Sequence, residues 1–365
     1  MGSPPVVELL KQLMEIPSTS DEEQKIGIFL ADYLKSLNYT VELVPIAPDS
    51  DRCNVYAYLG SNRKARTLVT SHMDTVPPHI PMRIEGDVIY GRGSCDDKGP
   101  LAAQIMAVEE LRAEGALKDG DVSLLFVVGE ENGGSGMFAV NDMNLSWEAG
   151  IFGEPTESKL ARGHKGHYVF ELLAKGTPAH SGYPEKGESA ITMLVSALSE
   201  LQAIDLPTSE LLGPSTYHCG KIEGGLAYNI LAAEAHALCS IRVATGLDDI
   251  KKKVSEVVDK YPSITFKKRV EYPETLLDFE IEGRAFQLFE VTATLMRLLG
   301  IDTMSVSFGT DVPRLKGSHK KYLYGPGSIL DAHGENEHVR IPDLINCVAV
   351  YKRLVLEVLK KDPEQ

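Results

Sequence analysis

One stretch of the sequence joins a buried strand to two adjacent acids. The apolar run Val122–Val128 is followed by Glu130, Glu131 and the glycine turn Gly133-Gly134. Such runs are typical of parallel strands covered on both faces, and open α/β sheets bind ligands beyond the carboxyl ends of these strands. Two neighbouring carboxylates there would repel each other and resist burial unless a cation lay between them. The run therefore predicts an α/β sheet with a charged site at its edge, and a solvated acidic turn is the alternative for the Glu-Glu pair taken alone.

Length and charge narrow the class of protein. The chain has 365 residues, enough for two domains, and 43% of them are hydrophobic. Its net charge of −15 argues against a nucleic-acid partner, because phosphate binding depends on clustered lysine and arginine. We find no secretory apolar segment and no membrane-spanning stretch, so we expect a cytoplasmic protein with no membrane partner. The five cysteines are scattered without a Cys-x-x-Cys pair, and we interpret them as mostly buried thiols rather than a zinc cage.

Helices and strands are predicted on both sides of the apolar run. Residues 4–37 are expected to form two helices, with Ser20 and Glu23 as a capping box for the second. Strands are predicted at Val41–Val44, Asn54–Leu59, Thr67–Thr70, Val122–Val128 and Ala149–Phe152. Further helices are predicted at Leu101–Gly115, Ala285–Leu299 and Leu344–Lys360.

The pattern changes between residues 164 and 274. It predicts, in order, a strand, a helix, two strands, a helix and a strand: His167–Lys175, Glu188–Ala203, Thr216–Ile222, Ala232–Val243, Asp248–Lys260 and Ile264–Val270. The order β-α-β-β-α-β is the split βαβ pattern of a compact antiparallel-sheet domain. We therefore predict an α/β protein in which residues 1–163 and 275–365 form one domain with a mixed sheet flanked by helices. Residues 164–274 are predicted to form an inserted α+β domain.

Five residues with metal-binding side chains end predicted strands or lie in loops of the first domain. They are His72, Asp96, Glu131, Glu154 and His333. Two imidazoles and three carboxylates can hold two divalent cations if one carboxylate bridges them, which gives each cation one nitrogen and two oxygen ligands.

The segment around Asp96 also has the composition of a phosphate loop, with Gly91, Gly93 and Gly99 close by. It lacks the Gly-Lys-Ser/Thr ending, however, and the pair Asp96-Asp97 would repel a phosphate. We interpret Asp97 and Lys98 as scaffold or solvated residues.

Asp74 is expected to orient His72. Side chains alternate along a strand, so these two residues would point to the same side. The carboxylate of Asp74 can accept a hydrogen bond from one imidazole nitrogen and leave the other nitrogen free for a cation. For His-x-Asp taken alone, a surface turn is the alternative.

The ordered combination of these motifs resembles the co-catalytic zinc family of acetylornithine deacetylases, succinyl-diaminopimelate desuccinylases, aminoacylases and glutamate carboxypeptidases. The resemblance covers nearly the whole chain, including the inserted domain. It implies a zinc-peptidase catalytic domain with an inserted lid and dimerisation domain, and a homodimer formed through that lid. It also implies two bound divalent metal ions, with zinc first and cobalt or manganese as alternatives.

The resemblance assigns a role to each candidate ligand. Asp96 would bridge the two ions, His72 and Glu154 would complete one site, and Glu131 and His333 would complete the other.

It also implies catalytic and substrate-binding residues. Glu130 would act as the general base and Asp74 would orient His72. His180 matches the lid histidine that stabilises the oxyanion in the partner's site of dimeric relatives.

The lid residues Asn229 and Arg242 match positions that grip the substrate carboxylate, and Gly309 and Thr310 match a substrate-contacting loop. A strand salt bridge is the alternative role for Arg242.

The favoured function is metal-dependent hydrolysis of the amide bond of N-acyl amino acids, with acetyl as the first acyl group to consider. The segment Gly163-His164-Lys165-Gly166-His167 looks closest to acetylornithine deacetylases. A metallo-dipeptidase or carboxypeptidase is the near alternative, because the same machinery cuts any amide whose carboxylate fits the lid. A catalytically silent homologue acting as a binding protein is the alternative from another class, and the presence of Glu130 with all five ligands argues against it.

Overall fold

The computed structural model of the chain describes residues 2–279 and 302–360, which belong to two compact units. Unit 1 is drawn from Met1–Arg162, Leu277–Met304 and Thr310–Gln365, and unit 2 from Gly163–Leu276 and Ser305–Gly309. The helix predicted at Ala285–Leu299 lies outside the described residues. Among the helices that are described, none is both long enough and apolar enough to cross a membrane.

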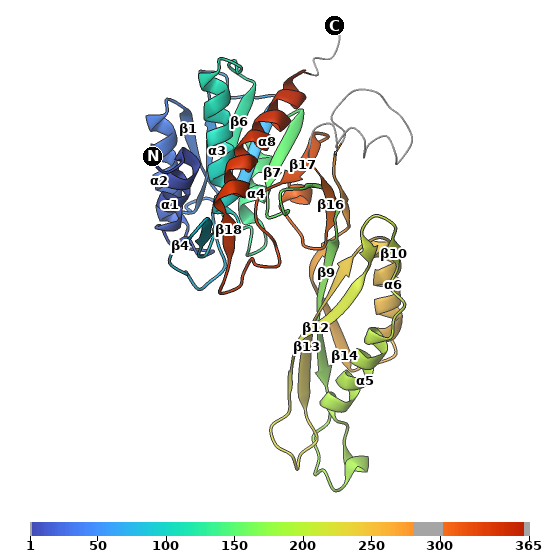
Figure 1. Cartoon of the computed structure of the whole chain (residues 1–365). Helices are drawn as coiled ribbons and strands as arrows, with labels where there is room; N and C mark the ends of the chain where they lie inside the picture. The colour runs from blue at the N-terminus through green and yellow to red at the C-terminus, as the bar shows by residue number, and fades with distance from the viewer. Residues whose placement is uncertain (1, 280–301, 361–365) are drawn as a thin grey trace. The chain divides into compact units, whose positions relative to one another are not determined.

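Unit 1 is built on a six-stranded mixed sheet of order β1-β2-β6-β3-β7-β17 (Figure 1). Its strands are β1 (Thr40–Pro45), β2 (Cys53–Tyr58), β3 (Thr67–His72), β6 (Val122–Val127), β7 (Ala149–Gly153) and β17 (Lys320–Tyr324). Strands β6, β3, β7 and β17 run parallel, whereas β1 and β2 are antiparallel to their neighbours. Every residue of β3 and β6 is buried, which confirms the prediction that the apolar run forms a strand covered on both faces.

Helices flank this sheet, and the predicted mixed sheet with flanking helices is confirmed. The helices of unit 1 are α1 (Pro5–Met14), α2 (Gln24–Ser36), α3 (Lys98–Ala113), α4 (Ser135–Val140) and α8 (Ile341–Lys360). Helix α3 packs against α1 and α8, and α2 packs against β1 and β2 (Figure 1). Their apolar side chains join those of the strands in one hydrophobic core.

Shorter elements complete unit 1. They are the 3-10 turns η1 (Asn141–Met143) and η3 (Val312–Arg314), and a three-stranded sheet of β4 (Arg83–Glu85), β5 (Val88–Tyr90) and β18 (His338–Arg340). A further sheet of order β15-β8-β16 contains Thr275–Leu276, Leu160–His164 and Thr303–Val306, at the points where the chain passes from one unit to the other.

The capping box predicted at the start of α2 is wrong. The helix begins at Gln24, and no side chain caps it. The hydroxyl of Ser20 instead donates a hydrogen bond to Oδ2 of Asp74 at 2.8 Å, and Glu23 forms an ion pair with Arg52 at 2.6 Å. Hydrogen bonds to residues far away in sequence therefore take the place of the predicted capping box.

Unit 2 contains a four-stranded antiparallel sheet of order β12-β13-β9-β14. Its main elements in chain order are β9 (Gly166–Lys175), α5 (Ala190–Gln202), β12 (Thr216–Gly224), β13 (Glu234–Val243), α6 (Leu247–Val258) and β14 (Ile264–Tyr272). This is the predicted β-α-β-β-α-β order. Smaller elements are η2 (Pro184–Lys186), β10 (Thr208–Ser209) and β11 (Gly213–Pro214).

The two helices of unit 2 pack on its sheet and enclose a second hydrophobic core. Alternate residues of β9 point into this core, so Phe170 is fully buried while Leu173 on the other face is 37% exposed. The ring of Phe170 stacks on Phe266 with centroids 5.3 Å apart.

We predict that Phe170→Ala lowers the free energy of unfolding of unit 2 by about 3–5 kcal/mol, because it leaves a cavity in this core. The matched change Leu173→Ala should cost less than about 1 kcal/mol, since that side chain is already partly in water. Hydrogen exchange of the β9 amides measures both values. Equal losses in the two variants would contradict the assignment of the inner face.

Candidate metal centre

Three neighbouring parallel strands of unit 1 deliver candidate ligands to one edge of the sheet. His72 is the last residue of β3, Glu131 follows β6 in a short turn, and Glu154 comes directly after β7. The register pairs His72 with Val127, so β3 and β6 end at the same level. Because parallel strands present their carboxyl ends at the same edge, these side chains meet beyond the sheet.

The turn after β6 depends on a glycine and an aspartate. Gly129 has φ +69°, a left-handed conformation that residues with a side chain rarely adopt, and an added Cβ would lie 2.6 Å from Oγ of Ser135. Asp74 holds the next two residues, accepting hydrogen bonds from the main-chain nitrogens of Glu130 at 3.0 Å and Glu131 at 3.2 Å. The carboxylate of Asp74 thus fixes the direction in which both glutamates leave the strand.

The ring of His72 has one nitrogen available for a cation. Its Nδ1 lies 2.9 Å from the main-chain oxygen of Asp74 and 3.6 Å from the carboxylate Oδ1 of that residue. A carbonyl oxygen can only accept, so Nδ1 donates, and Nε2 is the nitrogen that could exchange its proton for a cation. That Nε2 lies 3.0 Å from Oδ1 of Asp96. Burial lowers the pKa of His72, but Asp74 and Asp96 outweigh it and raise the pKa well above its usual value.

Asp96 lies between two imidazoles and presents one carboxylate oxygen to each. Its Oδ1 faces Nε2 of His72, and its Oδ2 lies 3.1 Å from Nε2 of His333. The same nitrogen of His333 is 3.1 Å from Oε1 of Glu131. Ligand atoms of His72, Asp96 and Glu131 all lie within 4.8 Å of one another, which is close enough to hold a metal ion.

Glu154 lies outside the cluster of His72, Asp96 and Glu131, in the wall of a neighbouring cavity. It is buried, and it lines a small cavity together with His72, Glu130 and Thr310. Burial raises the pKa of Glu154 well above its usual value, and the nearby Asp96 adds to the shift while His72 opposes it. This carboxyl group therefore resists ionisation unless further positive charge is present.

Glu130 contacts an arginine that sequence reasoning missed. Nη1 of Arg314 lies 2.7 Å from Oε1 of Glu130 and 2.7 Å from Oδ1 of Asp311. Burial, together with Asp311, raises the pKa of Glu130 to about 8, and Arg314 opposes that shift. The available signal was the spacing, because a basic residue three positions after Asp311 falls on the same side of the one-turn helix η3.

The donor set fits divalent cations. Imidazole and carboxylate together suit zinc, cobalt and manganese, and His72, Asp96, Glu131 and His333 already face one another. Hydrogen bonds with Asp96 and then Glu131 raise the pKa of His333 to about 10, so a proton balances the acids here. A bound cation would take over that role and displace the proton.

Asp97 and Lys98, interpreted as scaffold or solvated residues, are both fully buried. Oδ2 of Asp97 accepts a hydrogen bond from the main-chain nitrogen of His72 at 3.2 Å, and Nζ of Lys98 donates to the main-chain oxygen of Ile16 at 2.8 Å. They belong to the scaffold, and Asp97 supports the strand that ends in His72.

Two of the substrate-site candidates lie side by side in unit 2. The isolated bridge between His180 and Ile230 brings the two loops together, and the main-chain nitrogen of Ser181 donates to the oxygen of Asn229 at 3.0 Å. Both His180 and Asn229 are exposed. Nδ1 of His180 accepts a hydrogen bond from Gly182, and its ring meets Tyr183 edge-on at 5.9 Å.

Arg242 lies elsewhere in unit 2, on β13 opposite His167 of β9. Within the described part of the chain it forms no ion pair, so the alternative of a strand salt bridge is not seen. Lys165 is buried, and its pKa is lowered by burial and then by the positive charge of Arg242 nearby. Lys165 donates to the main-chain oxygen of Pro214 at 2.7 Å, and sequence reasoning did not single it out as a substrate-site candidate.

The remaining two candidates are consecutive residues that fall in different units. Gly309 belongs to unit 2, where an added Cβ would lie 2.0 Å from the hydroxyl of Tyr272. Thr310 belongs to unit 1 and is buried in the cavity wall beside Glu130.

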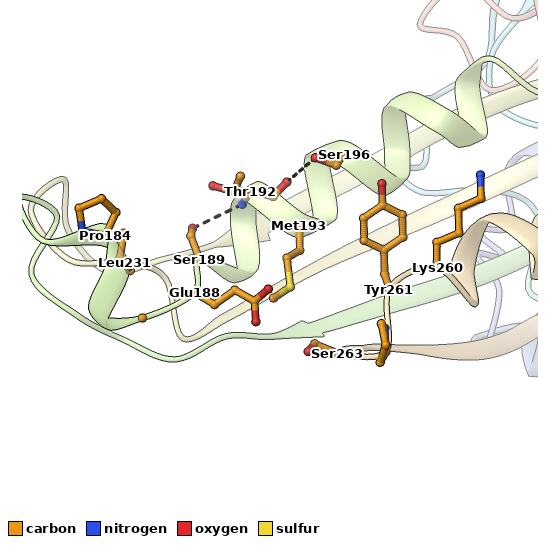
Figure 2. A pocket seen from close by; sticks show the side chains of 12 residues that line it. Pro184, Glu188, Ser189, Thr192, Met193, Ser196, Leu231, Lys260, Tyr261 and Ser263 are labelled. Carbon is orange, nitrogen blue, oxygen red and sulfur yellow. Dashed lines mark hydrogen bonds between the residues drawn. The ribbon is translucent and has the colours of Figure 1, made fainter.

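Another pocket lies in unit 2, between the start of α5 and the turn at residues 260–263 (Figure 2). Serine, threonine and methionine side chains line much of it, and the hydroxyl of Ser189 caps α5 by accepting from the nitrogen of Thr192 at 3.4 Å. Glu188 is the only carboxylate among the residues of its wall. This pocket therefore lacks the grouped donors that a metal ion requires.

Comparison with known proteins identifies relatives over most of the chain. Residues 68–357 match the family described as Peptidase family M20/M25/M40. Over 97% of its length, the chain is 46% identical to a peptidase M20 domain-containing protein of Schizosaccharomyces pombe, of which 85% is covered. It is 39% identical to a probable carboxypeptidase of Aspergillus flavus, with 97% of the chain and 90% of the relative covered.

A solved structure has a similar fold. A tripeptidase from Staphylococcus aureus matches with a TM-score of 0.78 at 24% identity, and the match covers 98% of this chain and 97% of that one.

We predict that Asp96→Asn loses most of the bound metal, because an amide presents one oxygen and cannot face both His72 and His333 with carboxylate atoms. Elemental analysis after dialysis against zinc should give less than half of the wild-type content. Asp142→Asn, an exposed acid of unit 1, serves as the control and should keep it. Full metal content in the Asp96 variant would place the ions elsewhere.

Proposed function

The chain belongs to Peptidase family M20/M25/M40, and we propose that it uses two divalent cations, zinc first among them, to hydrolyse small N-acyl amino acids. Family membership makes it a metal-dependent peptidase or amidohydrolase. The observation that supports a two-cation centre is the position of Asp96, whose two oxygens face His72 and His333 at 3.0 and 3.1 Å. One carboxylate shared by two imidazole ligands is the arrangement that a pair of cations needs.

When bound, such cations polarise an amide carbonyl and lower the pKa of a water molecule. In the proposed reaction Glu130 accepts the proton of the attacking water and passes it to the departing nitrogen. Arg314 holds Oε1 of Glu130 at 2.7 Å and so keeps the carboxylate in a fixed orientation. Asp74 fixes the main chain of the same turn. The products are a free amine and a carboxylic acid.

The substrate is proposed to carry a free carboxylate. Lys165 and Arg242 lie near each other in unit 2, and neither forms an ion pair within the residues that the structure describes. Two neighbouring cations without a carboxylate are unfavourable until an anion joins them, which supports this spot as the grip for that group. Asn229 is proposed to grip the same carboxylate, as the resemblance implies, and Gly309 and Thr310 are proposed to contact the rest of the substrate.

A carboxypeptidase or dipeptidase is the second candidate. It is favoured by the 39% identical relative from Aspergillus flavus, which is named a probable carboxypeptidase. Both candidates cleave an amide next to a free carboxylate, so they differ in the acyl side of the substrate.

A hydrolysis screen separates the candidates. We expect N-acetyl amino acids to be cut in the presence of zinc, cobalt or manganese, and their C-terminal amides to be cut at least tenfold more slowly. Amine release measures both. Turnover of dipeptides without turnover of N-acetyl amino acids would establish the second candidate, and no turnover with any metal would favour a silent binding homologue.

We predict that Glu130→Gln abolishes turnover but keeps the metal content, because the amide fills the same volume and cannot accept a proton. Amine release and elemental analysis on the same sample test the two halves of this statement. Near-normal activity would mean that the base lies elsewhere.

We also propose that the protein is a homodimer formed through unit 2. Strand β12 is an edge strand of nine residues, and most of them are exposed. An exposed edge is a template for pairing with the same strand of a twin molecule around a two-fold axis. In this dimer His180 would serve the metal centre of the other subunit and stabilise the oxyanion.

The proposed sharing can be tested by mixing two inactive variants, His180→Ala and Glu130→Gln. Loss of an oxyanion donor typically costs on the order of 100-fold in turnover, so each variant alone should be nearly inactive. If subunits exchange, about half of the dimers are mixed and each has one intact site, so up to about a quarter of wild-type activity should return. Mixtures that stay inactive despite proven exchange, or a chain that sediments as a monomer, would rule out sharing.

A further inference from the structure

Close to the candidate metal centre, unit 1 contains a buried ion pair that the proposed reaction does not use. Nη1 of Arg92 lies 2.6 Å from Oε2 of Glu337, and the two side chains are only 2% and 0% exposed. Moving two charged groups from water into the protein interior costs free energy. Their attraction offsets this cost only when further hydrogen bonds satisfy both groups. The partners of these two groups therefore indicate what the pair does.

Glu337 holds the segment that carries the proposed bridging ligand. Its Oε1 accepts hydrogen bonds from the main-chain nitrogens of Cys95 and Asp96, each at 3.2 Å. The main-chain oxygen of Glu337 accepts a third from the nitrogen of Gly91 at 2.9 Å. The loop that presents Asp96 is thus attached to Glu337 at both of its ends.

Arg92 holds the other loop. Its Nη2 donates to the main-chain oxygen of His333 at 3.1 Å, and its Nη1 donates to that of Gly334 at 3.3 Å. His333 has φ 64°, a left-handed conformation that is costly for a residue with a side chain and persists only where the surroundings hold it. The guanidinium fork supplies that support, because it reaches two carbonyls and a carboxylate at once.

We propose that the Arg92–Glu337 pair positions Asp96 and His333 relative to each other and thereby sets the affinity of the centre for its metal ions. Each charged group fixes the main chain beside one ligand, and the ion pair joins the two loops across 245 positions of sequence. Neither residue touches the metal or the substrate, so both are positioning residues. This inference rests on the proposed two-cation centre.

Three variants test it. Arg92→Lys keeps the charge but cannot donate to Glu337, His333 and Gly334 in one geometry. Glu337→Gln keeps the volume, but its amide either faces Arg92 with a donor or leaves the main-chain nitrogens without an acceptor. The double variant Arg92→Met with Glu337→Leu removes both charges, and a buried pair replaced by apolar residues often leaves stability unchanged. It remains informative if the single variants do not fold.

We expect all three variants to bind zinc 10–100-fold more weakly, the loss typical when a partner that orients a metal ligand is removed. Competition with a chelating dye measures that affinity without any assay of activity. The absorption spectrum of the cobalt-loaded protein should also change, since it reports the geometry of the ligands. Excess zinc should restore part of the turnover with little change in KM.

Two controls separate positioning from general stability. Glu148→Gln breaks the ion pair with Arg66, at the opposite end of β3 from His72, and should leave the zinc affinity unchanged. Val355→Ala removes buried apolar contacts in α8 and should lower the melting temperature, again without changing the zinc affinity.

Zinc affinities within twofold of wild type in the folded variants, together with an unaltered cobalt spectrum, would overturn the inference and leave the pair a structural role. If the wild-type protein binds no divalent metal, the proposed centre itself fails, and that result is distinct from the first.

Discussion

Buried negative charge at one edge of the sheet is the constraint on which the rest of unit 1 depends. Asp96, Glu131 and Glu154 are drawn together by strand ends and loops that the fold cannot move independently. Little water reaches these buried or partly buried acids, so each needs an imidazole, an arginine or a cation within reach. His333 meets that requirement for Asp96 and Glu131, and Arg314 meets it for the neighbouring Glu130 and Asp311.

The same constraint explains why some residues around the site depart from their usual local conformations and hydrogen bonds. The hydroxyl of Ser20 donates to Asp74 and does not cap a helix. Asp74 in turn accepts hydrogen bonds from the main-chain nitrogens of Glu130 and Glu131. His333 takes a left-handed backbone conformation to reach Asp96 and Glu131. Local preferences worth about 1–2 kcal/mol are outweighed where several charged hydrogen bonds are formed in exchange.

Much of this architecture was predictable from the sequence because strands and helices follow from the pattern of apolar and polar residues over short stretches of the chain. The apolar run before Glu130 indicated a strand covered on both faces, and the alternation in residues 164–274 indicated a separate antiparallel sheet. The candidate ligands His72, Glu131 and Glu154 could be found because they end or closely follow strands of the first sheet. The contact between Arg314 and Glu130 and the pair of Arg92 and Glu337 could not be found, since these partners lie 184 and 245 positions apart and only the folded chain brings them together.

The closeness of His180 to Asn229 was hidden for the same reason. Each falls in its own loop, and the bridge to Ile230 that joins the loops has no signature in either one. Lys165 gave no signal because a lysine between a histidine and a glycine is unremarkable until Arg242 is seen beside it. Residue type and spacing can reveal side chains that lie on the same helix, strand or loop. They cannot reveal side chains from different elements that meet only in the folded protein.

The wide separation of the ligands along the chain also decides when the centre can form during synthesis. His333 contacts Glu131 across 202 positions, and Glu337 reaches Asp96 across 241. Strands β3, β6 and β7 leave the ribosome long before either of these two residues is made, so a nascent chain can fold much of the first sheet while its acids lack their last partners. Until the segment with His333 and Glu337 emerges, a metal ion would meet an incomplete set of ligands, so full loading cannot precede the synthesis of this segment.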